Sequence, residues 1–146
     1  MRLIKFRAWD TRNKQMIIPV GLFWNDYTHT LFQYCKEEKE TRIAINIKNP
    51  NNDFVLMQFT GLKDKNGLTE IYEGDIVRYE INNHPSCQVI WQEQNCRYLL
   101  IDKDNYQYRC DDHTVLCCEV IGNIYESKHL LDNTDLGKNK VTDLAR

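Results

Sequence analysis

The sequence predicts a mostly β protein organised around a small antiparallel barrel. Short apolar and β-branched runs alternate with clusters of Gly, Pro, Asn and Asp along most of the 146 residues. This close spacing is typical of small antiparallel barrels. Residues 1–125 have no sustained helical periodicity. The length suffices for one domain, or two small ones, with a core that needs no disulfide or metal.

The stretch from Met57 to Val77 is the strongest fold signal. Apolar residues run up to Leu62, the pair Asn66-Gly67 follows, and strand-like sequence resumes towards Val77. An Asn-Gly pair tolerates the positive φ angles of a reversing turn with a bulge. We therefore expect a strand, a tight turn and a second strand, which together enter the barrel.

The first twenty residues predict a β-hairpin. In residues 2–9 the alternation of a half-buried strand places Ile4, Phe6 and Ala8 on one face and Lys5, Arg7 and Trp9 on the other. A polar turn at residues 10–14 and a strand at residues 15–20 complete the hairpin.

Three more strands are expected in the first third of the chain, at residues 22–24, 30–35 and 41–47, with an exposed charged turn at 36–40. Residues 49–53 hold one proline and three asparagines, which disfavour both helix and strand, so they predict a linker.

The second half of the chain predicts further strands at residues 76–81, 87–91, 98–101, 106–109 and 114–125. Turns are expected at residues 82–86 and 102–105, and residues 127–132 predict a short helix with Ser127 as N-cap. The expected division is an N-terminal β region at 1–54, the barrel at 55–127, and a short helix with a flexible tail at 128–146.

Charge and cysteine usage favour a cytoplasmic protein. The net charge is −2, with +3 in residues 1–56, −6 in residues 57–127 and +1 in residues 128–146. Any contact with a polyanion is therefore expected in the first third. No apolar run is long enough to span a bilayer, and the first residues do not form a signal-peptide core. Without an export signal, the six cysteines are expected to be reduced and mostly buried.

Two groups of residues have the spacing of a metal site. The pairs His84/Cys87 and Cys110/His113 each have the two-residue gap that zinc sites use. However, Cys87 shares the apolar parity of its strand and no turn glycines accompany the pairs, so we prefer a buried thiol and exposed turns. Aspartates at 102, 104, 111 and 112, and the turn that follows Leu62, suggest calcium, but they lack the features of a calcium loop and are better explained as turns.

No motif predicts an enzyme or a cofactor. The vicinal pair Cys117-Cys118 lies in an apolar stretch without a basic neighbour that would lower a thiol pKa. The histidines accompany no nucleophile motif, and no phosphate-binding glycine loop is present. A metal-dependent hydrolase is therefore the last of the three function classes that we consider.

A small basic and aromatic surface is the candidate binding site. It comprises Lys5, Arg7 and Trp9 on one predicted strand face, with Arg12 and Lys14 in the adjoining turn. Cations can hold phosphates while an aromatic ring stacks on a base. The alternative, which we favour, is that Trp9 packs against the second domain while the charges are solvated.

Three blocks of sequence, in order, resemble the YopX family of phage and prophage proteins. They are residues 5–10, residues 56–77 with their glycine-rich turns, and residues 119–131. The resemblance implies an SH3-like barrel and a bacterial host, but it assigns no activity and no site residues. The residues that repeat in the family are those that turns require, namely Gly61, Gly67, Gly74, Asp75 and Gly122.

We therefore predict a non-enzymatic accessory protein of a phage or prophage. It is expected to bind a phage or host protein, or a second copy of itself as a homo-oligomer, because a small barrel exposes strand edges that must be covered. The alternative is a nucleic-acid-binding small β-barrel protein.

Overall fold

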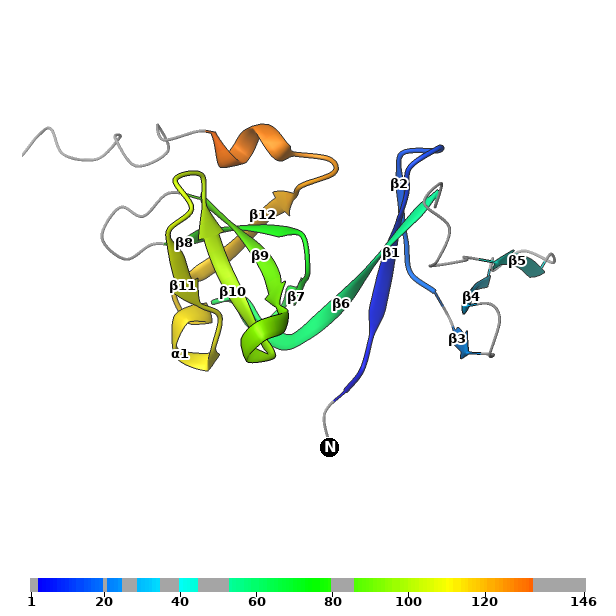
Figure 1. Ribbon diagram of the computed structural model, residues 1–146, viewed down its shortest axis with the longest axis horizontal. Coiled ribbons are helices and arrows are strands. Elements are labelled where there is room, and N and C mark those ends of the chain that lie inside the picture. Colours follow the sequence, from blue (N-terminus) through cyan, green and yellow to red (C-terminus); the bar gives the residue numbers. More distant parts are fainter. Residues whose placement is uncertain are drawn as a thin grey trace, which may run out of the picture. The chain divides into compact units, whose positions relative to one another are not determined.

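The computed structural model describes residues 3–19, 53–79 and 86–132 in full, and the backbone of three further strands within residues 21–44. The chain divides into two units, Met1–Phe59 and Thr60–Arg146. Strands dominate both, which confirms a mostly β fold (Figure 1). Within the described part, no helix is long and apolar enough to cross a membrane.

Several sequence-based expectations lie wholly or largely outside the described residues. They are the charged turn at 36–40, the linker at 49–53, the turn at 82–86 and the tail at 133–146.

The first unit is built around β1 (Phe6–Asp10), which lies between β2 (Gln15–Ile17) and β6 (Phe54–Lys63). The register places Ala8 opposite Ile17, so the predicted hairpin is confirmed. β2 and β6 are both antiparallel to β1 and hence parallel to each other. Parallel strands require a crossover connection.

That crossover carries a second sheet. Its strands are β3 (Gly21–Trp24), β4 (His29–Tyr34) and β5 (Glu40–Ala44), paired antiparallel in the order β3-β4-β5. Leu31 is the register partner of Leu22 on one side and of Ile43 on the other. The three strands expected from the sequence in this region are therefore present.

β6 continues into the second unit, where its sheet neighbour is β7 (Glu70–Tyr72). The connecting turn is longer than the tight turn expected from the Asn-Gly pair. The Gly67 N–H donates to the carbonyl of Asp64 at 2.8 Å, and the Asp64 N–H donates to the carbonyl of Thr69 at 2.9 Å. A positive φ of 68° falls at Gly67, where glycine adopts it without a Cβ clash.

Gly74 forms the corner between β7 and β8. Its φ is 76°, its N–H donates to the carbonyl of Val89, and its carbonyl accepts the N–H of Ile124, both at 2.9 Å. The buried carboxylate of Asp75 accepts the N–H of Tyr72 at 2.7 Å. This corner thus ties three separate segments of the second unit together.

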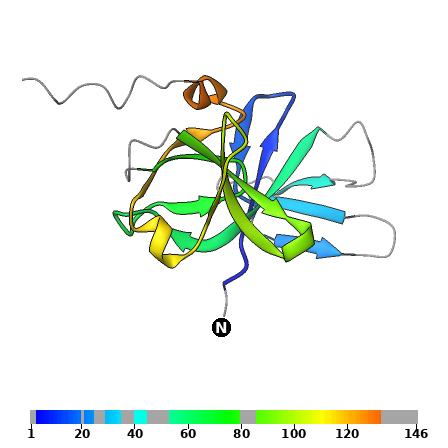
Figure 2. The same cartoon turned by 60° about the vertical axis from the view of Figure 1, so that its left-hand side comes forward.

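Five strands make the main sheet of the second unit, in the order β11-β10-β9-β8-β12. Their bounds are β8 Asp75–Tyr79, β9 Ser86–Gln92, β10 Arg97–Asp102, β11 Gln107–Arg109 and β12 Cys118–Asn123, with the 3₁₀ helix η2 (Glu93–Asn95) between β9 and β10. The antiparallel sheet curls into a barrel-like form (Figure 2). The Lys65 N–H donates to the carbonyl of Cys118 at 2.8 Å, which links the β12 edge to the segment after β6.

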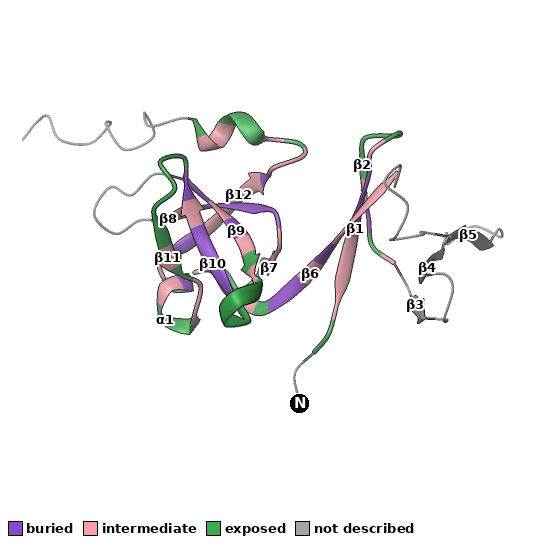
Figure 3. Cartoon of the chain, viewed as in Figure 1, coloured by how far each residue is buried: buried purple, intermediate pink, exposed green. Residues whose placement is uncertain are grey.

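The core of the second unit follows the parity expected from the sequence. Val77 on β8, with Cys87 and Val89 on β9, is fully buried, and these residues share a cluster with Ile71, Tyr98, Leu100, Val115 and Cys118. Figure 3 shows buried stretches in β8, β9 and β10, while η2 and the turn between β10 and β11 are exposed. Burial of this apolar surface is the main source of stability of the unit.

Two expectations near the C-terminal end of the barrel were wrong. The strand predicted from Thr114 is replaced at its start by one helical turn, α1 (Asp112–Val115), and β12 begins at Cys118. The reason is that the Asp111 carboxylate accepts the backbone N–H of Thr114 at 2.9 Å and caps the turn. The predicted C-terminal helix is the 3₁₀ helix η3 (Lys128–Leu131), and Ser127 makes no side-chain capping bond to it.

Ser127 packs against the sheet instead. A Cβ on Gly122 would lie 2.8 Å from the Ser127 Cβ and 3.1 Å from Leu130 Cδ1. The register of β12 against β8 also shifts between Val120 and Gly122, which indicates a bulge. Glycine at 122 therefore allows η3 and the residue before it to lie directly on β12.

We predict that Gly122→Ala lowers the free energy of unfolding by about 1–3 kcal/mol, because the new methyl group overpacks this contact. Adding Ser127→Gly should recover part of the loss, whereas Ser127→Ala, which keeps the Cβ, should recover less. Urea unfolding of the wild type, the three single variants and the two double variants measures the coupling. Wild-type stability of Gly122→Ala would contradict the assignment.

Candidate functional site

Three of the five predicted binding residues, Lys5, Arg7 and Trp9, lie in or next to β1 and face the same side. Their register partners on β6 are known from the backbone ladder. Arg7 pairs with Met57, and the Phe59 N–H donates to the carbonyl of Lys5 at 2.9 Å. These residues therefore line one face of the β1–β6 pair.

The two cations on this face contact apolar side chains. The Lys5 ammonium lies 5.6 Å from the centroid of the Phe59 ring, within the range of a cation–π contact. Arg7 Nη2 lies 3.8 Å from Met57 Sδ. Both side chains are half-buried, whereas Met57 and Phe59 are buried. The stems of the cations thus extend the apolar surface of the strand pair.

Trp9 is buried, with only 4% of its surface exposed. Its burial accords with the favoured interpretation that the ring packs within the protein, although the domain against which it packs stays a prediction. The expectation of a half-buried strand was wrong at this position, since Ala8 on the opposite face is also fully buried. A ring at this exposure cannot stack on a nucleobase without leaving its site.

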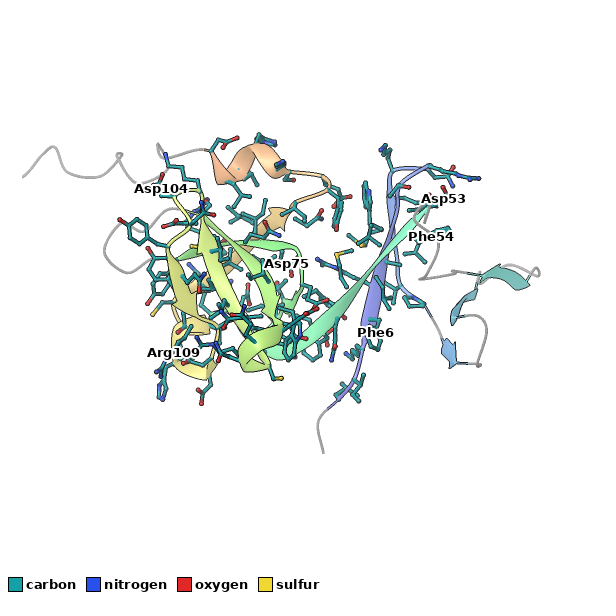
Figure 4. All side chains as sticks on the ribbon, viewed as in Figure 1. Phe6, Asp53, Phe54, Asp75, Asp104 and Arg109 are labelled. Carbon is teal, nitrogen blue, oxygen red and sulfur yellow. The ribbon has the colours of Figure 1, made fainter. Side chains whose placement is uncertain are left out.

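The other two predicted residues, Arg12 and Lys14, lie in the exposed hairpin turn. Arg12 Nε lies 2.6 Å from Asp53 Oδ1, and the Thr11 N–H and hydroxyl donate to the Asp53 carbonyl at 2.7 and 2.9 Å. Figure 4 labels Asp53 beside the turn and Phe6 at the other end of β1. The turn and Lys5 are about 20 Å apart along the strand, so the five residues do not form one patch.

Asp10 holds the hairpin turn in place. Its buried carboxylate accepts the backbone N–H groups of Arg12 and Asn13, both at 2.9 Å, and the Asn13 amide at 2.7 Å. Burial alone would raise the pKa of this carboxyl, but the hydrogen bonds from Asn13 and Arg12 and the Arg12 charge outweigh it and lower the pKa.

The residues proposed as zinc ligands are in poor environments for a metal. Cys87 is fully buried, Cys110 is half-buried and His113 is exposed, while His84 lies outside the described residues. Burial raises the pKa of both thiols to about 12, and metal ligation requires the thiolate. Over the described ranges, no three His, Cys, Asp or Glu residues are grouped so as to hold a metal ion.

The carboxylates of the two calcium-like stretches are engaged by their own turns. Asp102 accepts the N–H groups of Asp104 and Tyr106 at 2.9 Å and the hydroxyl of Tyr108 at 3.1 Å. Asp64 accepts the N–H of Asn66 at 3.2 Å. The turn interpretation made from the sequence is therefore supported by the geometry, because the oxygens already have donors.

The vicinal cysteines differ in their surroundings. Cys118 is buried and its thiol donates to the carbonyl of Thr114 at 3.3 Å, whereas Cys117 is half-buried and precedes β12. One thiol thus faces the core, as the sequence predicts. Cys87, Cys96, Cys110, Cys117 and Cys118 are all free thiols.

A strand edge that was not expected from the sequence lies next to the predicted basic residues. β2 pairs with β1 only as far as Ala8, and Pro19 falls at the register position opposite Phe6. Ile4 and Ile18, which flank this edge, are 66% and 76% exposed. The sequence signal was Pro19, because a proline offers no N–H and ends a ladder.

Comparison with known proteins gives a family match and a similar crystal structure. The profile described as "YopX protein" matches residues 5–132. The chain belongs to the YopX family. A crystal structure of protein EF1440 from Enterococcus faecalis is similar, with a TM-score of 0.61 and 28% identity over 90% of this chain and 99% of that chain. Among curated proteins, no match was found.

The backbone geometry of this chain explains four of its glycines as fold determinants. Gly67 and Gly74 take positive φ in turns, and so does Gly61, at 92° within β6. Gly122 accommodates Ser127. In this YopX protein, these four glycines therefore shape the backbone.

We predict that Asp10 makes the stability of the protein depend on pH. Its pKa in the folded state lies below the ordinary value of 3.8, so folding favours the carboxylate. This stabilisation is complete well above pH 3.8 and is lost as the pH falls through the lowered pKa. The difference in free energy of unfolding between wild type and Asp10→Asn should shrink between about pH 5 and about pH 2. A constant difference would contradict this role.

We also predict that Cys96 is the reactive thiol among the five described cysteines, because it is exposed while burial holds the pKa of Cys87 and Cys110 near 12. Iodoacetamide at pH 8, followed by peptide mass spectrometry, should label Cys96 first and Cys87 and Cys110 only after unfolding. The experiment uses a Cys35→Ser protein, so that only the five described cysteines can be labelled. Adding Cys96→Ser should remove the fast phase of labelling. Early labelling of Cys87 would be inconsistent with its burial.

Proposed function

We propose that this protein is an accessory protein of a phage or prophage that acts without catalysing a reaction. It acts by binding a protein partner, or a second copy of itself, through its sheets. The proposal includes an SH3-like assignment for the barrel of residues 55–127 and a location in the bacterial cytoplasm. Free cysteines accord with that location.

The main support for the proposal is the exposed apolar surface. Among the described residues, seven large hydrophobic side chains are exposed, from 40% for Trp91 to 83% for Leu68. They lie at strand ends and in turns, and the others are Leu3, Ile4, Ile18, Tyr106 and Leu116. By contrast, four carboxylates that could have taken part in chemistry accept backbone N–H groups in turns. They are Asp10, Asp64, Asp102 and Asp111. Exposed apolar residues beside strand edges favour association over catalysis.

Nucleic-acid binding, the alternative from the sequence, has less support. The burial of Trp9 removes the ring expected to stack on a base, and the cations lie at the two ends of β1. We therefore do not extend the proposal to nucleic acid.

The proposed function predicts a stoichiometric complex. We expect the tagged full chain, expressed in a bacterial host that carries the phage genes, to retain one partner protein, or a second copy of itself, after a wash in high salt. Quantitative mass spectrometry against a tag-only control identifies the partner, and light scattering over a hundredfold concentration range tests self-association. A monomer that retains no protein above the control level would refute the proposal.

A further inference from the structure

The direction of the backbone groups of β1 follows from its ladder with β6. The Phe59 N–H donates to the Lys5 carbonyl and the Thr11 N–H donates to the Asp53 carbonyl, so odd-numbered residues of this segment bond towards β6. In an antiparallel strand, successive residues direct their N–H and C=O groups to opposite sides. The backbone groups of Ile4, Phe6 and Ala8 therefore point to the side of β2.

On that side, the ladder stops early. Ala8 pairs with Ile17, but the position opposite Phe6 is Pro19, which has no N–H to donate. Within residues 3–19 and the other fully described ranges, the backbone of Ile4 and Phe6 makes no hydrogen bond on this side. We call residues 3–7 the open edge of β1.

The open edge is apolar and basic. Leu3, Ile4 and the neighbouring Ile18 are 57%, 66% and 76% exposed. Lys5 and Arg7 alternate with the apolar residues and point to the other face of the strand. An extended strand whose Ile4 and Phe6 backbone groups point to a side where the ladder has ended is a template for a further strand.

The positive charges of Lys5 and Arg7 determine which kind of strand can pair with the open edge. If a second copy added its own open edge in the antiparallel register that overlaps fully, Lys5 would lie opposite Lys5 of that copy, and like charges directly opposite each other are destabilising. An incoming strand with carboxylates opposite Lys5 and Arg7 is instead stabilised by attraction between opposite charges at these positions. Its intervening residues would lie on the face of Ile4 and Phe6, where apolar side chains fit.

We propose that the open edge of β1 binds, by strand addition, an extended segment of a partner protein in which acidic and apolar residues alternate. This inference rests on the proposed function and names the chemistry of the partner. The incoming backbone supplies partners for the groups of Ile4 and Phe6, and Ile18 covers the apolar side of the strand end.

The test uses the full-length protein and two fluorescein-labelled hexapeptides, one alternating Glu with Val and the other alternating Lys with Val. Fluorescence anisotropy should show that the acidic peptide binds at least about tenfold more tightly than the basic peptide. Its affinity should fall as NaCl rises from about 50 to about 500 mM, because the pairing is electrostatic at an exposed edge. Equal affinity of the two peptides, or no binding of the acidic one, overturns the proposal.

Matched variants of Ile4 separate the backbone contribution from that of the side chain. Ile4→Pro removes the N–H that points to the open side and should weaken binding of the acidic peptide about tenfold. Ile4→Ala keeps that N–H and should change the affinity by less than about threefold. Residue 4 precedes β1, and the urea midpoint of each variant checks that the fold is retained. Equal effects of the two substitutions would exclude strand addition.

A charge reversal provides the second check. Lys5→Glu combined with Arg7→Glu should reverse the preference, so that the basic peptide binds more tightly. If the acidic peptide fails to bind while the Ile4→Pro protein still retains a stoichiometric partner from cells, the open edge is excluded but the proposed function stands. Loss of both the peptide and any cellular partner from the wild-type protein would refute both.

Discussion

The backbone ladder between β1 and β6 is the constraint on which the rest of the first unit depends. It runs from the Lys5–Phe59 pair to the Thr11–Asp53 pair, and it therefore sets which β1 residues face each side. Trp9 shares a face with Arg7 because both occupy odd positions of this ladder. The open edge exists for the same reason, since the even positions point towards β2 and β2 is short.

β6 also connects the two units of the chain. Its first half pairs with β1, and its end leads through the Asp64–Thr69 turn to β7 and the barrel. The turn itself depends on local chemistry, with a carboxylate that accepts backbone N–H groups and a glycine at positive φ. Gly74 then joins the corner to Val89 and Ile124. Glycines at 67 and 74 are therefore what these connections require.

Several thiols and carboxylates of the described residues are engaged within the fold. Thiols in the core have raised pKa values, and carboxylates such as Asp102 and Asp111 are already hydrogen-bonded in turns. A thiol with a raised pKa is a poor nucleophile and a poor metal ligand at neutral pH, because little of it is thiolate. At the surface of the described residues, seven large hydrophobic side chains are exposed.

The sequence by itself determined the features that depend on neighbours along the chain: the β class, the hairpin turn at Asp10, the glycine at 67 and the inward parity of Val77 and Cys87. Tertiary structure alone decided the burial of both Ala8 and Trp9 on the two faces of β1, and the packing of Ser127 against Gly122. Turn and parity signals are local because φ angles and alternation are properties of a short segment. Burial and strand pairing are set by residues distant in sequence, which no local pattern contains.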